Sequence, residues 1–377
     1  MKQYITSESV TKGHPDKLCD QISDSILDEC LSQDPYSRVA CEALAANDNL
    51  IIAGEITTKA NVDYEAIARK TIASIGYDND EKYYNASKVK IQNIIHTQSP
   101  DIAQGVDVGG AGDQGIMYGY ATNETHTFMP LPISIAHSLS RKLEEVREKG
   151  ASFIYPDGKT QVTVIYDEKN KPIGIDTILI STQHQKDYDQ LVLRSFLIEK
   201  VISTVIQDYG FEIENIQKIL TNPTGVFNVG GPVGDSGLTG RKIIVDTYGG
   251  VGRHGGGAFS GKDPTKVDRS GAYIARYLAK NIVASGLCEK CEIQISYAIG
   301  VSQPISIYVE CFNTEKVAKE KIIEIIYNNF DLSPKGIINK LDLRKPGYSK
   351  TSSGGHFGRD LFSWERLDSI LIFKKIL

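Results

Sequence analysis

Basic side chains gather around a glycine-rich segment in the last third of the chain. Residues 256–262 follow the spacing of a phosphate-binding loop, which is a glycine, four residues, a second glycine and a lysine. That loop also requires Ser or Thr at the next position to hold magnesium, but this chain has Asp263, so the ordinary motif is not met. Backbone amides beside a lysine still favour an anion, and the alternative is a flexible loop with solvated charges. The cations that we expect near a polyphosphate are Arg241, Lys242, Arg253, His254, Lys262 and Lys266.

Carboxylates near these cations are candidates for magnesium, which is typically bound by one or two carboxylates together with phosphate oxygens. Asp16 lies in the first turn of a predicted helix and Asp268 follows the lysine cluster, so these two are our candidates. Asp20, Asp24 and Asp28 continue a row on the face of Asp16, because residues four apart are neighbours on a helix. We expect these three to be mostly solvated.

His14 stands two residues before Asp16, beside Pro15 and close to Lys17. Its imidazole has a suitable position to donate a hydrogen bond to a phosphate or bridging oxygen of a substrate. The alternative is that His14 only caps the helix.

The elements that must position these residues recur three times along the chain. A β-prone run is followed by a capped amphipathic helix at residues 54–58 with 63–74, 178–182 with 187–206, and 305–310 with 314–328. A second helical pattern appears at residues 15–31, 133–149 and 267–285. We therefore predict an α+β fold of three similar units, each with a mixed sheet covered by helices.

The glycine-rich segments lie between these elements, at residues 105–119, 225–240 and 249–261. Glycine runs cost backbone entropy on folding, so their presence needs a reason. The reason that we expect is close approach of the backbone to a ligand. The β-rich run that starts at Lys242 predicts a strand, and after Lys262 we expect a helix with Asp263 as its cap and Pro264 in its first turn.

Composition bounds the class of protein. Apolar residues make up 41% of the 377-residue chain, charged residues 24%, and the net charge is -5. The length predicts two or three domains, and a mildly acidic chain argues against nucleic acid as the main partner. No apolar run approaches about 20 residues and the first residues lack a signal peptide, so we predict no membrane partner and a cytoplasmic location.

The cysteines predict reduced thiols, and we expect Cys19 and Cys30 to be packing residues. Only Cys288 and Cys291 have metal-like spacing. A structural zinc site needs four ligands and no second pair is present, so we interpret them as an incidental pair.

Three long motifs together resemble those of one enzyme family. They are Gly-His-Pro-Asp-Lys at 13–17, Gly-Ala-Gly-Asp-Gln-Gly at 110–115 and Gly-Gly-Ala-Phe-Ser-Gly-Lys-Asp at 256–263. In this order they are similar to signatures of bacterial-type S-adenosylmethionine synthetases (methionine adenosyltransferases), and the resemblance runs from Thr6 to Arg359. It implies three similar domains about a pseudo-threefold axis, for which we predict approximate and possibly interleaved ranges of 1–97, 98–228 and 229–377. It also implies a homodimer with active sites between subunits, or a tetramer built from two such dimers.

The resemblance implies a two-step reaction. The sulfur of methionine attacks C5′ of ATP and the whole triphosphate leaves, after which triphosphate is hydrolysed to pyrophosphate and phosphate. The sulfur carries no proton to remove, so fixed cations and metals must stabilise the leaving oxygens. The implied cofactors are Mg²⁺, two per site, and an activating K⁺.

The resemblance also implies roles for individual residues. Those contacting ATP or its leaving triphosphate would be His14, Asp157, Lys159, Val226, Phe227, Asp235, Arg241, Lys242, Ala258, Lys262 and Lys266, with Phe227 stacking on adenine. Those holding methionine would be Glu55, Gln98, Asp113, Asp235 and Lys266. Asp16 and Asp268 would bind magnesium and Glu42 potassium, and residues 98–107 would form a mobile gate.

Two positions depart from the family pattern. Val226 stands where many relatives carry Arg or Lys, which leaves only a backbone contact there, and the connection from Asp107 to Gly110 is short. Two other functions remain open: an ATP-dependent phosphotransferase, which would release ADP, and a non-catalytic nucleotide-binding regulatory subunit, which would form no product.

Overall fold

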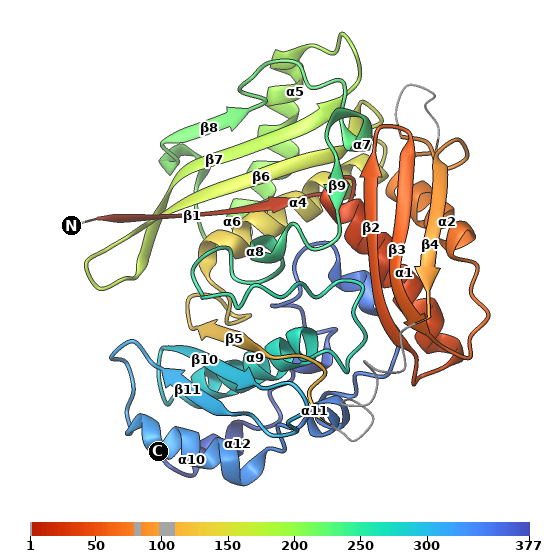
Figure 1. Cartoon of the computed structure of the whole chain (residues 1–377). Coiled ribbons are helices and arrows are strands. Elements are labelled where there is room, and N and C mark those ends of the chain that lie inside the picture. Colours follow the sequence, from red (N-terminus) through yellow and green to blue (C-terminus); the bar gives the residue numbers. More distant parts are fainter. Residues whose placement is uncertain (1, 79–83, 98–109) are drawn as a thin grey trace.

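The computed structural model describes residues 2–78, 84–97 and 110–377, and within them the strands form three sheets (Figure 1). The N-terminal sheet has the order β4-β3-β2-β9, the central sheet β1-β6-β7-β8 and the C-terminal sheet β11-β10-β5. Helices cover each sheet, and the pairing in the first two sheets is mixed. The predicted α+β class with three units is therefore confirmed.

The N-terminal sheet consists of β2 (Arg38–Ala46), β3 (Asn49–Thr57), β4 (Lys90–His96) and the short β9 (Gly237–Leu238). Strands β2 and β3 are antiparallel, whereas β4 runs parallel to β3. Helices α1 (Pro15–Gln33) and α2 (Tyr64–Ile75) cover one face. Both helices match the predicted ranges closely, because Pro15 begins α1 and Asp63 caps α2 by accepting a hydrogen bond from the amide of Ala66.

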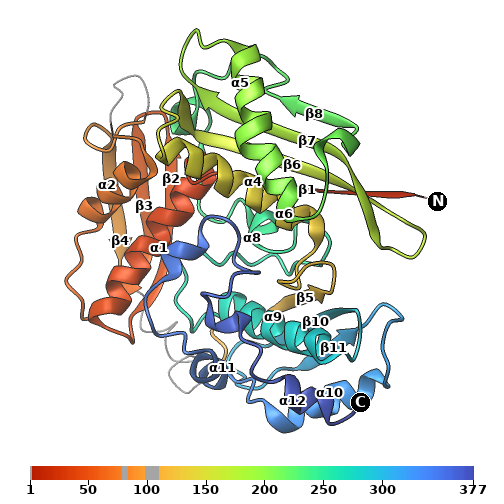
Figure 2. The same cartoon turned by 180° about the vertical axis from the view of Figure 1, so that it is seen from behind.

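The central sheet consists of β1 (Gln3–Val10), β6 (Ile154–Tyr166), β7 (Pro172–His184) and β8 (Lys218–Thr221). Helix α4 (Leu131–Glu148) packs on β6 and β1. The helix predicted for 187–206 is built from α5 (Gln190–Phe196), a π-helical turn at Leu197–Ile202 and α6 (Ser203–Asp208). Figure 2 shows these helices on the same side of the sheet.

The C-terminal sheet consists of β5 (Gly115–Thr122), β10 (Lys290–Tyr297) and β11 (Ser306–Glu310). Helix α9 (Val267–Ser285) packs on β5 and β10 over its whole length, as the predicted range required. Helix α10 begins at Lys319 and ends at Asn329, later than the predicted start at 314. The amide and hydroxyl of Thr314 both donate to the carbonyl of Cys311, so this segment forms a turn before the helix.

Each sheet takes a strand from a distant part of the sequence. Strand β1 joins the central sheet, β5 joins the C-terminal sheet and β9 joins the N-terminal sheet. The domain ranges 1–97, 98–228 and 229–377 stay a prediction. They describe segments of the sequence, whereas each sheet includes a strand from another segment. This exchange brings residues after Gly237 against the start of α1, where the candidate site lies.

Two local predictions around the glycine-rich segment are wrong. The run after Lys242 is not a strand but the short helix α8 (Ile243–Asp246), in which the amide of Asp246 donates to the carbonyl of Lys242 and the Asp246 carboxylate reaches the buried Lys17. Asp263 does not cap α9, which begins at Val267. Its buried carboxylate instead accepts from the amides of Val39 and Thr265.

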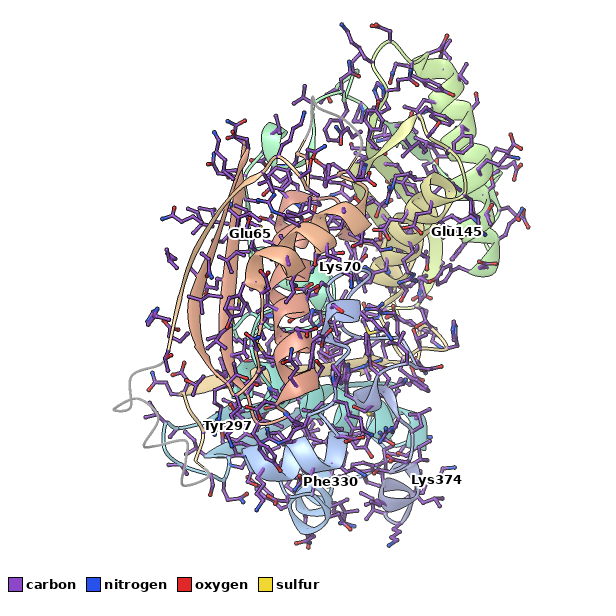
Figure 3. The ribbon with its side chains drawn as sticks, turned by 90° about the vertical axis from the view of Figure 1, so that its right-hand side faces the viewer. Glu65, Lys70, Glu145, Tyr297, Phe330 and Lys374 are labelled. Atoms are coloured by element: carbon purple, nitrogen blue, oxygen red, sulfur yellow. The ribbon has the colours of Figure 1, made fainter. Side chains whose placement is uncertain are left out.

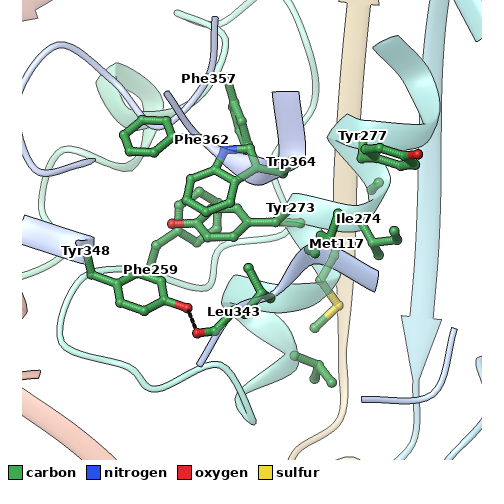
Figure 4. Packing of buried hydrophobic residues seen from close by; sticks show 14 of the residues in the cluster. Met117, Phe259, Tyr273, Ile274, Tyr277, Leu343, Tyr348, Phe357, Phe362 and Trp364 are labelled. Carbon is green, nitrogen blue, oxygen red and sulfur yellow. Dashed lines mark hydrogen bonds between the residues drawn. The ribbon is translucent and has the colours of Figure 1, made fainter. Parts of the chain in front are cut away.

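Aromatic side chains fill the core behind the glycine-rich segment (Figure 4). Phe259 is buried within that segment, and its ring lies 5.6 Å from the ring of Tyr273 on α9. Tyr273 stacks in turn on Trp364 with centroids 3.8 Å apart. Phe259 thus anchors the segment to α9, so the alternative of a loosely held loop does not apply.

The remaining short elements connect or flank the sheets. They are the 3₁₀ turns Ile213–Asn215, Tyr348–Thr351 and Ser363–Glu365 and the helices α7 (Gly231–Gly234), α11 (Pro334–Leu341) and α12 (Ile370–Lys374). Among the helices that the structure describes, none is long and apolar enough to cross a membrane.

Candidate active site

The start of α1 holds His14 in a defined tautomer. His14 is the N-cap, and its Nδ1 accepts a hydrogen bond of 3.1 Å from the amide of Asp16, so the ring proton of the neutral form lies on Nε2. Burial and then the charges of Lys242 and Lys159 lower the pKa of His14 to about 3. His14 therefore caps the helix and is also a neutral hydrogen-bond donor.

Asp16 is the centre of the first charged cluster. Its Oδ1 accepts from the amide of Leu238 at 3.0 Å, and its Oδ2 accepts from Nζ of Lys242 at 2.5 Å. Arg241 lies at the edge, with Nε 4.0 Å from Oδ1. Burial alone would raise the pKa of Asp16, but the hydrogen bonds from Lys242 and Leu238 outweigh it and lower the pKa. The carboxylate is thus ionised, with cations on one side.

Unpartnered acceptor oxygens lie next to this cluster. Asp157 is buried on β6; its Oδ2 accepts from the amide of Gly231, whereas its Oδ1 has no hydrogen-bond partner among the described residues. Burial raises the pKa of Asp157 to about 6. Oε1 of Gln183 and Oδ1 of Asn228 are likewise buried without partners in the described part of the chain. A ligand that donates hydrogen bonds would satisfy these oxygens.

The candidate adenine contacts lie on the segment that follows β8. The amide of Phe227 donates to Nε2 of His184, and the amide of His184 donates to the carbonyl of Phe227, so the backbone is fixed. Val226 beside it is 64% exposed, which leaves its backbone accessible. Asp235 is exposed at the end of α7, and its charge acts on Asp157. Lys159 is exposed on β6, and its charge acts on both Asp157 and His14.

A second charged cluster forms at the start of α9. Nζ of Lys262 lies 2.6 Å from Oδ2 of Asp268, and Lys266 forms an ion pair with Asp263. A side chain at Gly257 would collide with the Asp268 carboxylate, since its Cβ would lie 2.3 Å from Cγ. Asp268 is therefore covered by backbone on one side and bonded by a lysine on the other.

The glycines of this segment mainly admit other backbone. A Cβ at Gly255 would lie 1.7 Å from the carbonyl oxygen of Ile116, and one at Gly261, where φ is +79°, would lie 1.9 Å from that of Cys41. A Cβ at Gly256 would meet no atom within 4 Å. Contact with strands β5 and β2 explains Gly255 and Gly261. Gly256 faces open space, as does Gly250, and open space is what the ligand-approach expectation requires. Ala258 of this segment packs close to Gly240, since a Cβ added at Gly240 would lie 2.6 Å from the Cβ of Ala258.

The prediction that the aspartate row on α1 is mostly solvated is wrong. Asp20 and Asp24 are fully buried, because segments from the end of the chain and from the glycine-rich region pack over this helix face. Asp20 accepts from Lys17 and from the amide of Gly240. Asp24 forms two hydrogen bonds with Arg269, of 2.7 and 2.9 Å. Asp28 is half-buried and accepts from the backbone amides of Gly347, Tyr348 and Ser349.

Lys17 and Asp246 form a buried layer beneath the first cluster that sequence reasoning missed. Lys17 contacts both Asp20 and Asp246, so one cation faces two carboxylates. Burial raises the pKa of Asp246 to about 7 although Lys17 opposes the shift. A lysine in the first turn of a helix gives no signal of this role in the sequence, because its partner Asp246 lies 229 residues away.

The remaining candidates lie on the N-terminal sheet, in the segment before β5, or outside the described residues. Glu42 and Glu55 project from the face of the N-terminal sheet that α1 and α2 do not cover, and Oε1 of Glu55 lies 3.6 Å from Nε2 of His96. Asp113 is exposed before β5 and accepts from the amide of Gln114. Gln98 and the predicted gate at 98–107 lie outside the described residues.

Two of the basic residues expected beside the polyphosphate have other partners. Arg253 pairs with Glu292 at 3.2 Å, and Glu292 also accepts from the amide of Arg253. Nδ1 of His254 accepts from the amide of Gly256, and burial lowers the pKa of His254. Both residues therefore shape the glycine-rich segment.

Comparison with known proteins gives full-length matches. Family models described as S-adenosylmethionine synthetase match in order: the N-terminal domain at residues 2–100, the central domain at 108–227 and the C-terminal domain at 229–366. The S-adenosylmethionine synthase of Mesoplasma florum is 54% identical over 380 residues, covering all of both chains. The chain belongs to the S-adenosylmethionine synthetase family. The S-adenosylmethionine synthase of Mycoplasma capricolum subsp. capricolum is also 54% identical, over 99% of this chain and 97% of its own.

The three motifs of this synthetase family begin the elements that carry the clusters. Residues 13–17 start α1, residues 110–115 lead into β5 and residues 256–263 precede α9. The motif residues therefore occupy positions where backbone amides and charged side chains meet. Gln183 and Asn228 lie outside these motifs, and no spacing in the sequence marks them.

Proposed function

We propose that this synthetase-family chain makes S-adenosylmethionine from ATP and L-methionine, by attack of the methionine sulfur on C5′ of ATP. The observation that carries the proposal is the pair of clusters in which a lysine ammonium group lies against a carboxylate, Lys242 at Asp16 and Lys262 at Asp268. Such clusters suit a polyphosphate and its metal ions. The names of the two S-adenosylmethionine synthases that this chain resembles support the same reaction.

The chemistry makes few demands on proton transfer. The sulfur attacks with a lone pair, the C5′–O bond breaks, and its electrons leave with the triphosphate. The neutral His14 can donate from Nε2 to the oxygen that gains this charge, since Nδ1 is already occupied by the amide of Asp16. Lys159, Arg241, Lys242, Lys262 and Lys266 then hold the triphosphate until it is hydrolysed to pyrophosphate and phosphate.

Asp16 and Asp268 are the residues that would hold magnesium, and their surroundings fit it. Each carboxylate already balances a lysine ammonium group at 2.5 or 2.6 Å. When ATP arrives, its phosphates compete for those lysines, so both carboxylates become available to metal ions. Mg²⁺ held by these carboxylates, proposed at two ions per site, would supply positive charge against the charge that develops on the triphosphate. Glu42, an exposed carboxylate on β2, is the proposed ligand of K⁺.

We assign the organic parts of the substrates to the neighbouring residues. Phe227 would stack on adenine, with the backbone of Val226 and Ala258 beside it. Asp157 and Asp235 would accept hydrogen bonds from the nucleoside, and Gln183 and Asn228 offer further buried acceptors nearby. Glu55, Gln98, Asp113 and Lys266 would bind methionine together with Asp235, under a gate formed by 98–107.

We propose a homodimer, or a tetramer of two dimers, and one uncovered sheet face supports this proposal. In Figure 3, α2, marked by Glu65 and Lys70, lies on one side of the N-terminal sheet. No described helix covers the other side, where Leu44 is 37% and Ile94 is 50% exposed. Glu42 and Glu55 lie on the same face. We further propose that, in such a dimer, the Asp16 cluster of one subunit meets the Asp268 cluster of its partner.

Complementation between inactive variants tests this shared site. Lys242→Ala removes a cation from the Asp16 cluster, and Lys262→Ala removes one from the Asp268 cluster. In a mixed dimer one site would carry both changes and the other neither, so co-expression should restore about a quarter of wild-type activity. Mixed dimers can be isolated with two affinity tags. If these mixed dimers show no recovery of activity, each site lies within one chain.

We also propose a cytoplasmic location. All six cysteines lie within the described residues and are free thiols, which suits a reducing compartment.

A product assay tests the reaction. Purified protein with ATP, methionine, Mg²⁺ and K⁺ should form S-adenosylmethionine, pyrophosphate and phosphate, and only when methionine is present. ADP as the product would favour a phosphotransferase. ATP binding by folded protein without any product would favour a regulatory subunit.

A further inference from the structure

Three cysteines meet at the end of the C-terminal domain that is farthest from the charged clusters. Cys288 follows the last turn of α9, Cys291 lies on β10, and Cys311 comes directly after β11. Their Sγ atoms all lie within 4.8 Å of one another, and each side chain is at most 3% exposed. The pairing of Glu292 with Glu310 explains why residues 291 and 311 are neighbours. The interpretation of Cys288 and Cys291 as an incidental pair is therefore wrong, because Cys311 joins them.

The two loops that carry these thiols are already fixed to each other. The amide of Lys316 donates to the carbonyl of Leu287, and the amide of Glu289 donates to Oγ1 of Thr314. Oγ1 of Thr314 donates in turn to the carbonyl of Cys311. The sulfur atoms are thus held by backbone contacts that do not involve them.

A carboxylate oxygen without a partner lies between these anchors. Oε2 of Glu315 is buried and has no hydrogen-bond partner among the described residues, while its Oε1 lies 3.9 Å from Nζ of Lys319. The charge of Glu315 acts on the Cys288 thiol. A buried ionic oxygen without a partner is costly, so a cation at this place would stabilise it.

We propose that Cys288, Cys291 and Cys311 form a structural zinc site. The Glu315 carboxylate lies outside the group of atoms within 4.8 Å of one another, and it would become the fourth ligand by turning its side chain toward the sulfur atoms. Zn²⁺ takes four ligands in a tetrahedron, with Zn–S bonds of about 2.3 Å, which places the sulfur atoms about 3.8 Å apart. The three sulfur atoms lie within 4.8 Å of one another, so each would have to move by about 1 Å or less to bind the ion. Binding releases the three thiol protons to solvent, and no oxidation is involved.

The site is structural because it is remote from the charged clusters. Asp268 is in the first turn of α9 and Cys288 follows its last turn, so about 1.5 Å per residue over 19 residues separates them by roughly 28 Å. The ion would join the end of α9 to the β10–β11 pair. Because α9 also carries Asp268 and Arg269, the metal would stabilise the domain that positions one of those clusters.

Metal analysis of the full-length protein tests the proposal. Protein purified from zinc-supplemented cells without chelator should contain about one zinc ion per chain. Under anaerobic conditions Co²⁺ should replace it and give tetrahedral d–d bands together with a near-ultraviolet thiolate-to-cobalt band. Removing zinc with a chelator should lower the melting temperature, and added Zn²⁺ should restore it whereas Mg²⁺ should not.

Matched variants locate the site. Cys311→Ser should abolish both the zinc content and the cobalt thiolate band, whereas Cys30→Ser, which changes an equally buried cysteine on α1, should keep both. Glu315→Gln should weaken zinc in chelator competition about 10- to 100-fold. Wild-type protein that neither retains zinc nor gives the cobalt band, or that contains a disulfide among these cysteines, would overturn the site. Full zinc affinity in Glu315→Gln would overturn the assignment of the fourth ligand.

Discussion

Replacing Asp24 by Asn should destabilise the protein far more than the same change at an exposed position of the helix would. Asp24 and Arg269 are both fully buried and share two hydrogen bonds, of 2.7 and 2.9 Å. Arg269 stays charged in the variant, and the new amide NH₂ group would face its guanidinium donors. Breaking one side of a buried pair typically costs about 3–5 kcal/mol.

The loss converts to a measurable shift in melting temperature. An unfolding entropy of about 2.1 cal/mol/K per residue amounts to roughly 0.8 kcal/mol/K for this chain, so the variant should melt about 4–6 °C lower. Differential scanning calorimetry at one fixed protein concentration measures this shift. Activity should fall as well, since Asp24 accepts from the amide of Gly261 and Arg269 donates to the carbonyl of Lys262.

Asp28→Asn is the matched control, because it makes the same change one turn along α1. Within the described part of the chain, Asp28 accepts only from backbone amides and pairs with no arginine, so its variant should lose less, about 1–2 kcal/mol. The double variant Asp24→Leu with Arg269→Met should be more stable than Asp24→Asn, since it leaves no unpaired charge. A melting shift for Asp24→Asn no larger than that for Asp28→Asn would refute the reasoning.

Three further predictions concern catalysis, binding and pH. Lys262→Ala should keep the fold, because its side chain is partly exposed, but slow adenosyl transfer about 10²- to 10³-fold; wild-type turnover would count against the phosphate role. Asp113→Asn should weaken methionine about 10- to 100-fold and ATP much less, and equal effects in calorimetry would contradict that assignment. Burial lowers the pKa of His137 well below 6.5, so the unfolded chain gains a proton first and stability falls as pH drops below 6.5. His137→Gln should reduce that slope in denaturation curves relative to wild type, and unchanged slopes would exclude His137 as a source.

The helices of the fold could be predicted because their periodicity and caps are local. Pro15 marks the start of α1, and the ranges of α1 and α9 agree with the pattern. Helix α8 could not be predicted, because Ile243, Ile244 and Val245 favour a strand and only the contact of Asp246 with Lys17 explains the helical turn. The strand exchange among the sheets is likewise a tertiary property.

The charged clusters could be predicted only in part. The phosphate-like spacing indicated Lys262, and the motif around His14 indicated Asp16. Burial of Asp24 depends on Arg269, which lies 245 residues away, so the helix face alone could not show it. The cysteine cluster had one usable signal, since pairing of the two strands before and after residues 298–305 places Cys311 opposite Cys291.

A single-turnover experiment tests the central claim most directly. Excess protein is mixed with γ-³²P-labelled ATP, methionine and Mg²⁺, quenched at successive times, and separated into nucleotides and phosphates. S-adenosylmethionine should appear together with labelled triphosphate, which then decays to pyrophosphate and phosphate, and ADP should not form. Labelled phosphate with ADP before any S-adenosylmethionine would contradict displacement of the whole triphosphate.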